Sequence, residues 1–154
     1  MARFFLPALF LGFTLLSAQT ADPRWEPLRF LIGKWKGSGA GDPGAGQGAF
    51  SFSPELNGHI LVRRSFNQLA SGTRHEDLMI VYAGEEGKAP HAIYFDNEGH
   101  TILYEVAFPA ASTAVFTATG SPGYRLTYNL DKGTLNGRFE VGGKTYLTWT
   151  SVRE

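Results

Sequence analysis

Residues 124–141, YRLTYNLDKGTLNGRFEV, carry the clearest structural pattern in the chain. Apolar side chains at positions 124, 126, 128 and 130 alternate with polar ones at 125, 127 and 129, and the alternation resumes at Leu135. Between the two runs stand Asp131, Lys132 and Gly133, and glycine accepts the positive φ of a tight turn. Because successive side chains of a strand point to opposite faces, the pattern predicts a β-hairpin with one apolar face.

Turn signals of the same kind recur along the rest of the chain, from Gly41-Asp42-Pro43-Gly44 to Gly142-Gly143. Nine such turns separate ten runs of about 7–12 residues, a spacing typical of a meander or barrel. Ten sequential antiparallel strands would leave long exposed edges unless the sheet closes on itself. We therefore expect an all-β fold, a single antiparallel barrel of about ten strands.

One short segment, residues 23–32, has helical rather than strand spacing. Trp25, Leu28, Leu31 and Ile32 recur at helical intervals, and Gly33 ends the pattern. We expect this helix to close one end of the barrel, within a single β-barrel domain spanning residues 24–154. Residues 60–62 and 78–82 are apolar on both faces, which predicts contact with the barrel interior or with a covering element.

The N-terminus has the three parts of a secretory signal. Arg3 precedes an almost wholly apolar run, residues 4–16, and the small Ser17 and Ala18 follow. This run is too short to cross a hydrocarbon layer of about 30 Å as a helix. We predict a signal peptide over residues 1–18, an exported protein that is periplasmic or secreted, and no membrane span after it. A retained N-terminal anchor is the alternative.

Charge and composition exclude several classes of function. The chain has 14 basic and 14 acidic side chains, so no nucleic-acid partner is expected. It has no cysteine, which excludes a disulfide scaffold, a thiolate metal site and a cysteine nucleophile. The G-x-G-x-x-G match at residues 39–44 precedes a strand instead of the helix that a dinucleotide site requires.

The segment Gly33-Lys34-Trp35-Lys36-Gly37 resembles the Gly-x-Trp opening of the calycin barrels, which include lipocalins, fatty-acid-binding proteins and nitrobindin-like proteins. Residues 28–33 and the Gly-rich hairpin after them are most similar to the nitrobindin-like group, and residues 75–100 are similar to uncharacterised exported bacterial barrels. In calycins the tryptophan closes one barrel end beneath a basic residue of the last strand. The resemblance implies that Trp35 is buried under the Arg153 guanidinium.

The resemblance also raises haem as a cofactor. Nitrobindin-like proteins hold haem iron through a histidine near the C-terminal end of the barrel. Residues 124–154 contain no histidine, and His59, His75, His91 and His100 lie on earlier segments. We therefore expect no cofactor and no tight haem site, with a haem-binding barrel as an alternative. No metal site is expected either, because Asp96, Glu98 and His100 are better explained as turn residues.

Arg63-Arg64 places one guanidinium on each face of its strand, so one of the two must point inward. An inward arginine needs a carboxylate partner or an anionic ligand, because an unpaired buried charge is very costly. Fatty-acid-binding proteins bind a carboxylate through inward arginine and tyrosine, so the resemblance implies an anionic ligand. An internal partner, Glu76, Asp77 or Glu105, is the alternative.

The turn at residues 96–100 allows two geometries. If Asn97-Glu98-Gly99 is a three-residue loop with Gly99 left-handed, Asp96 faces His100 across the hairpin. Period two then places Tyr94, Ile102 and Tyr104 on that same face. If the loop has two or four residues, Ile93 and Phe95 share the face of His100 instead.

These observations favour an exported barrel that binds a small apolar or amphipathic ligand with an anionic or hydrogen-bonding head. An isomerase or cyclase using His100 and Asp96 for proton transfer is an alternative, as is a structural barrel with a filled interior. No motif for nucleophilic catalysis is present, so the sequence favours a binding protein over an enzyme but leaves catalysis open. The residues expected to contact the ligand are Arg63, Arg64, His75, Tyr94, His100 and Tyr104, with His75 near the rim.

Overall fold

The computed structural model describes residues 23–41, 45–84, 88–120 and 122–154. A nine-residue 3₁₀ helix, η1 (Pro23–Leu31), precedes ten strands. The strands are β1 (Gly33–Gly41), β2 (Gly46–Glu55), β3 (Ile60–Leu69), β4 (Arg74–Tyr82), β5 (His91–Asp96), β6 (Thr101–Ala110), β7 (Thr113–Ala118), β8 (Tyr124–Asp131), β9 (Thr134–Val141) and β10 (Lys144–Arg153). The predicted signal peptide lies outside the described residues. Among the helices of the described part, none is long and apolar enough to span a membrane.

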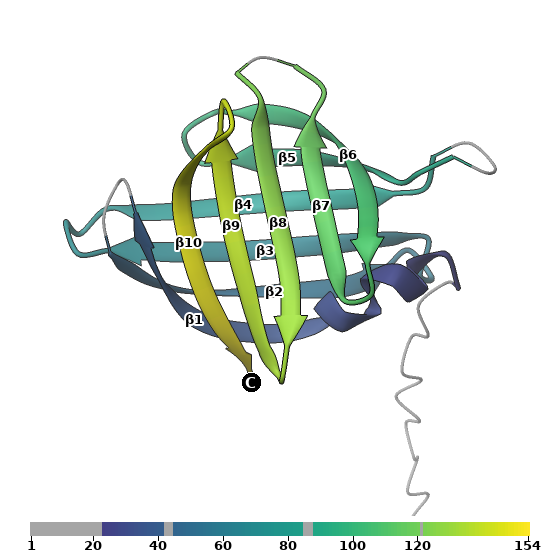
Figure 1. Cartoon of the computed structure of the whole chain (residues 1–154), viewed down its shortest axis with the longest axis horizontal. Coiled ribbons are helices and arrows are strands. Elements are labelled where there is room, and N and C mark those ends of the chain that lie inside the picture. The colour runs from purple at the N-terminus through teal and green to yellow at the C-terminus, as the bar shows by residue number, and fades with distance from the viewer. Residues whose placement is uncertain (1–22, 42–44, 85–87, 121) are drawn as a thin grey trace, which may run out of the picture.

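Each strand pairs antiparallel with the next, and β1 pairs with β10, which closes the barrel. Figure 1 shows β1–β4 crossing behind β7–β10 at a steep angle. The closing register runs from Trp35 opposite Arg153 to Gly41 opposite Leu147. A closed sheet has no free edge to pair with another chain. The predicted all-β barrel of about ten strands with a short N-terminal helix is confirmed.

Helix η1 lies at one end of the barrel, at the lower right of Figure 1, and buries one row of side chains. A 3₁₀ helix has three residues per turn, so Trp25, Leu28 and Leu31 lie on one side of it, and all three are buried in the barrel core. The indole N–H of Trp25 donates to the carbonyl of Gly58 at 2.6 Å. The helix therefore plugs this end, which we call the closed end.

Trp35 and Arg153 join the first and last strands at the closed end. Trp35 is buried, and its indole N–H donates to the Leu31 carbonyl at 2.8 Å. The Arg153 guanidinium carbon lies 4.5 Å from the centroid of the Trp35 ring, and the guanidinium donates to the carbonyls of Ile32 and Phe30. Gly33 has a φ of 127°, and a Cβ there would lie 2.5 Å from the Arg153 Nη1. The Gly-x-Trp segment thus positions the arginine that covers it.

An aromatic cluster fills the barrel interior from η1 to the middle of the barrel. Tyr128, fully buried, lies edge-on to Phe52 and to Phe116, with ring centroids 5.9 and 6.0 Å apart. Tyr104 and Phe116 make a similar contact at 6.4 Å. Such edge-to-face pairs stabilise a core beyond simple area burial. The half of the barrel next to η1 is therefore packed solid.

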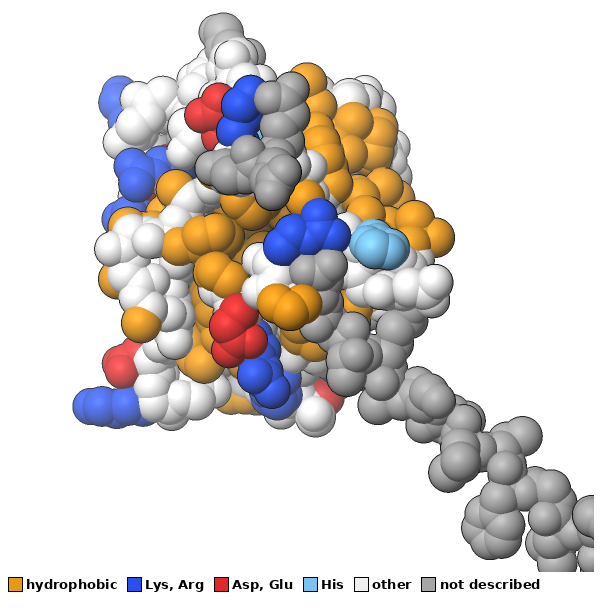
Figure 2. Space-filling model, turned by 90° about the vertical axis from the view of Figure 1, so that its right-hand side faces the viewer, with side chains coloured by type: hydrophobic (Ala, Val, Ile, Leu, Met, Phe, Trp, Pro, Cys, Tyr) orange, Lys and Arg blue, Asp and Glu red, His pale blue; other side chains and the backbone are white. Residues whose placement is uncertain are grey.

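The outer surface carries apolar side chains as well. Seen from the side of Figure 1 on which η1 lies, hydrophobic side chains cover a broad area with charged ones interspersed (Figure 2). Val62, Ile80, Ile93 and Leu103 form one outward row across β3–β6. Val62 is buried, whereas Leu103 is 51% exposed. This row accounts for the two-faced apolar runs of β3 and β4.

Candidate functional site

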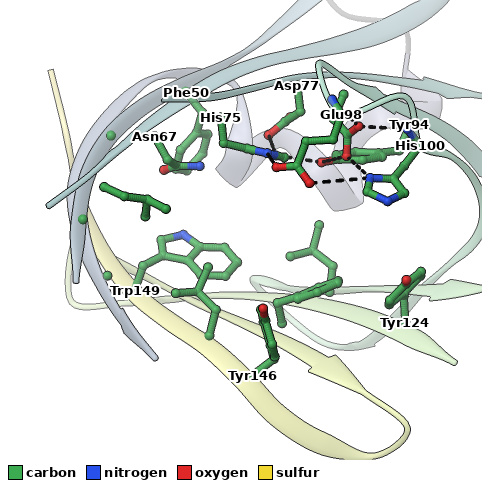
Figure 3. Close-up of a pocket in the computed structure, with 18 of the residues that line it drawn as sticks. Phe50, Asn67, His75, Asp77, Tyr94, Glu98, His100, Tyr124, Tyr146 and Trp149 are labelled. Atoms are coloured by element: carbon green, nitrogen blue, oxygen red, sulfur yellow. Dashed lines mark hydrogen bonds and ion pairs between the residues drawn. The ribbon is translucent and has the colours of Figure 1, made fainter. Parts of the chain in front are cut away.

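The half of the barrel opposite η1 contains a cavity of about 720 Å³. One wall is apolar and aromatic, and Figure 3 shows it facing a polar wall. The apolar wall comes chiefly from β8–β10 and includes Tyr124, Leu126, Phe139, Tyr146 and Trp149. The polar wall comes from β3 to the start of β6 and includes Arg63, His75, Asp77, Tyr94, Asp96, Glu98 and His100.

The space itself comes from glycines on β1 and β2. Gly37 pairs with Gly48, and Gly39 pairs with Gly46, so two adjacent strands lack inward side chains at the same levels. A Cβ at Gly48 would lie 2.3 Å from the Asn67 Oδ1 and 2.4 Å from the Phe66 carbonyl oxygen. The close approach of β3 thus requires glycine at this position, and the missing side chains leave the cavity open.

Arg63 is the arginine that points inward, and it forms a buried ion pair with Asp77 of β4. Burial by itself would lower the pKa of the Arg63 guanidinium, but the Asp77 carboxylate together with Tyr128 and Tyr94 outweighs it, and the pKa is raised. The arginine therefore stays charged and is neutralised within the protein. Arg64 points outward, where its guanidinium lies 2.5 Å from the Glu55 carboxylate, and it does not line the cavity.

Asp96 and His100 face each other across the β5–β6 hairpin. Residues 97–99 form a three-residue loop, and Gly99 has a φ of 91°. Asp96 Oδ1 accepts hydrogen bonds from the backbone N–H groups of Glu98 and His100, and Oδ2 lies 2.9 Å from the His100 Nδ1. Burial alone would raise the pKa of Asp96, but these hydrogen bonds lower it. A neutral His100 that donates from Nδ1 keeps a lone pair on Nε2.

Tyr94 connects this pair to a second histidine–carboxylate pair. Its hydroxyl lies 3.0 Å from the His75 Nε2 and 3.3 Å from the Asp96 Oδ2. The His75 Nδ1 lies 3.0 Å from the Glu98 Oε1. Burial raises the pKa of Tyr94, and the neighbouring carboxylates raise it further, so the phenol stays protonated. A continuous series of polar contacts at hydrogen-bond distance therefore runs along the polar wall, through Glu98, His75, Tyr94, Asp96 and His100 (Figure 3).

The residues that the sequence indicated fall into two groups. Five of them line the cavity: Arg63, His75, Tyr94, His100 and Tyr104. The sixth, Arg64, lies on the outside of β3, because its neighbour Arg63 takes the inward position. The hairpin has the geometry that places Tyr94, Ile102 and Tyr104 on the inner face. A role of these side chains in binding stays a prediction.

Sequence reasoning missed the apolar wall, above all Trp149. Its ring lies against Gly137 of β9, where a Cβ would come within 1.9 Å of ring atoms. A glycine inside a strand often marks the close approach of another group, so Gly137 could have indicated that a large side chain packs against β9 at this point. Tyr124, Leu126 and Phe139 were visible as one apolar face of the β8–β9 hairpin, but the pattern did not show that this face lines a cavity.

The described residues contain no group of three or more histidine, aspartate or glutamate side chains that could hold a metal ion. For haem, His75 has both ring nitrogens within hydrogen-bond distance of other side chains. His100 keeps Nε2, but its side chain is 54% exposed at the mouth of the cavity. These donors do not fit a buried haem iron, and no chemistry is derived through one.

No family model matches the chain, and no curated protein does. Among solved structures, three designed barrels are similar to it. A de novo fluorescence-activating β-barrel has 11% identity and a TM-score of 0.48, covering 82% of this chain and 95% of its own. A redesigned β-barrel has 14% identity and a TM-score of 0.49, covering 88% and 99%. A redesigned β-barrel bound to DFHBI has 16% identity and a TM-score of 0.44, covering 80% and 99%. Likenesses of this size identify neither a family nor a function for this chain.

Proposed function

We propose that the protein binds a small, mostly apolar ligand in the open half of the barrel. The observation that carries this proposal is the cavity of about 720 Å³ between an apolar and a polar wall. Ligand pockets in proteins measure roughly 300–1,000 Å³ and combine apolar walls with a few placed polar groups. Leu126, Phe139 and Trp149 offer contact to a hydrocarbon, and the opposite wall offers hydrogen bonds to a polar head.

The head group is better supported as a hydrogen-bonding one than as an anionic one. The anionic head expected from the sequence depended on an inward arginine without an internal partner. Arg63 is inward, but Asp77 already neutralises it. Tyr94, His75 and His100 remain as groups that can orient a polar head from the other side of the cavity.

A matched pair of substitutions tests ligand binding. Ile102 lines the cavity, and its neighbour Leu103 faces outward and is 51% exposed. Ile102→Trp fills the cavity, whereas Leu103→Trp adds the same indole outside it. With octanol as a neutral probe in isothermal titration calorimetry, we expect binding by the parent and by Leu103→Trp, and at least about a tenfold loss in Ile102→Trp. No octanol binding by the parent, or equal binding by both variants, contradicts the proposal. Circular dichroism verifies that both variants fold.

A second candidate, an enzyme acting by proton transfer, is favoured by the Asp96–His100 pair. A carboxylate bonded to Nδ1 directs the Nε2 lone pair to act as a general base. The base would take a proton from a carbon next to a carbonyl, and the electron pair would move into the enolate oxygen. The test is exchange of deuterium from heavy water into a long-chain methyl ketone. Exchange that His100→Gln abolishes supports this candidate, and exchange no faster than in buffer rejects it.

The proposal places this binding protein outside the cytoplasm and in a calycin-like family, on the sequence evidence of residues 1–18 and the Gly33-x-Trp35 segment. Expression of the full chain in a bacterial host, followed by intact mass measurement of the periplasmic and cytoplasmic fractions, tests the first part. A periplasmic product lacking the first 18 or so residues is expected. Uncleaved protein confined to the cytoplasm contradicts it.

A further inference from the structure

The charges that face the cavity are predominantly negative. The described residues that line it include three carboxylates, Asp77, Asp96 and Glu98, and one arginine, Arg63. Arg63 is paired with Asp77, which leaves Asp96 and Glu98 without a lysine or arginine partner on this wall. Their described side-chain partners are His100, Tyr94 and His75. With three carboxylates against one guanidinium, a bound head group therefore meets a surplus of negative charge.

One acceptor in the polar wall also receives no described hydrogen bond from the protein. Asp77 uses Oδ1 for the ion pair with Arg63, and its side chain is only 4% exposed. Its Oδ2 lies 3.8 Å from the His75 Nε2, which is beyond hydrogen-bond distance, and that nitrogen already contacts the Tyr94 hydroxyl. Among the described residues no hydrogen bond to Oδ2 is formed. Because Asp77 lines the cavity, its Oδ2 is free to accept a hydrogen bond from a ligand donor.

Charge and geometry together narrow the class of ligand, on the basis of the function proposed above. We infer that the ligand is an amphipathic amine, whose protonated head lies against the polar wall near Asp77 and Glu98 and whose hydrocarbon lies against the apolar wall. A protonated amine supplies both the positive charge that the wall lacks and the N–H donor that Asp77 Oδ2 lacks. A carboxylate of the same length supplies neither, and it faces two carboxylates whose charge no arginine or lysine of the wall neutralises.

The test compares three probes of one chain length: octylamine, octanol and octanoate. The titrations are run at low ionic strength and about pH 8, where an alkylamine is protonated, like lysine, and a free carboxylate is ionised. We expect octylamine to bind more tightly than octanol and octanol more tightly than octanoate, with about a tenfold or greater difference between amine and carboxylate.

A pair of charge-neutralising variants locates the effect. Glu98→Gln removes one charge at the cavity mouth, where the glutamate side chain is 56% exposed and the substitution is compatible with folding. Glu76→Gln makes the same change on β4 but outside the cavity. Glu98→Gln should weaken octylamine about threefold or more and affect octanol less than octylamine, while Glu76→Gln should change neither.

The outcomes separate the inference from the proposed function. If octanol binds but octylamine binds no more tightly, or octanoate binds best, the amine is wrong and the binding cavity stands. If Glu76→Gln weakens octylamine as much as Glu98→Gln, the preference is a general charge effect and the inference also fails. If none of the three probes binds, the proposed function fails as well.

Discussion

The closed and open halves of the barrel are built from the same ten strands, yet one half is packed solid and the other is hollow. Trp35 of β1 pairs with Phe50 of β2, and both rings point inward and stack with centroids 6.4 Å apart. The next inward pairs toward the open end are Gly37 with Gly48 and Gly39 with Gly46. From one inward pair to the next, the inward side chains of both strands thus change from two aromatic rings to none.

On the opposite side of the barrel the same boundary appears as a change in polarity. The inward residues of β4 run from Val81 and Met79 to Asp77 and His75 toward the mouth. Arg63 of β3 lies where the apolar positions end. The position of an inward residue along its strand, rather than the strand it belongs to, therefore determines whether it packs in the core or lines the cavity.

The largest expected effect comes from truncating the closed half. Leu28 of η1 is fully buried in the barrel core, so Leu28→Ala should lower the free energy of unfolding by about 3 kcal/mol, because it leaves a cavity in packed surroundings. Leu126→Ala enlarges a space that already exists, and we expect about 1–2 kcal/mol. Urea unfolding of both variants measures the difference. Equal losses would mean that the two halves are packed alike.

The second-largest effect is expected at alkaline pH, which should destabilise the closed half. Burial raises the pKa of Tyr128 to about 12, against an ordinary value near 10. Below about pH 10 the phenol is protonated in both states, and above it the unfolded chain loses the proton first. Unfolding free energy should therefore fall by roughly 1.4 kcal/mol per pH unit between about 10 and 12 from this residue. Tyr128→Phe should reduce that slope, whereas Tyr82→Phe on the outer surface should not.

The features that could be predicted from the sequence are those that do not depend on the pairing register between strands. Alternation and turn residues predicted the strands, because both are local properties of the chain. The inward choice of Arg63 over Arg64 could not be predicted, since it depends on how β3 pairs with its neighbours. The meeting of Gly37 with Gly48 is likewise a property of two strands in register. A shift in pairing between Thr145 and Leu147 in β10 also breaks the simple period that would have placed its inward residues.

The contact that joins the barrel ends should have a smaller effect. Arg153→Ala removes the stacking on Trp35 and two hydrogen bonds to carbonyls at the end of η1. We expect a loss of about 1 kcal/mol in unfolding free energy, because the guanidinium is partly exposed. Val152→Ala, at an exposed position beside it, serves as the control and should be near neutral. A loss as large in the control would assign the effect to β10 in general.

The smallest expected effect is the contribution of Asp96, in the open half, to the loss of stability at acid pH. Hydrogen bonds lower the pKa of Asp96, so its contribution to stability is present above the ordinary carboxyl pKa and is lost as pH falls through its lower folded value. Asp96→Asn should therefore weaken the decline in stability below about pH 4. Denaturant midpoints across this range, compared with Asp131→Asn at the β8–β9 turn, measure the change. An unchanged acid profile would show that the hairpin network does not stabilise the carboxylate.

The most direct measurement is a crystal structure of the protein with a bromine-labelled octanol, whose anomalous signal locates the ligand. We predict one bromine peak inside the open half, against Leu126, Phe139 and Trp149, with the hydroxyl directed to the polar wall. The closed half should show no peak, and the peak should vanish in Ile102→Trp. Bromine found only on the outer surface, or an interior filled by side chains, would contradict the account.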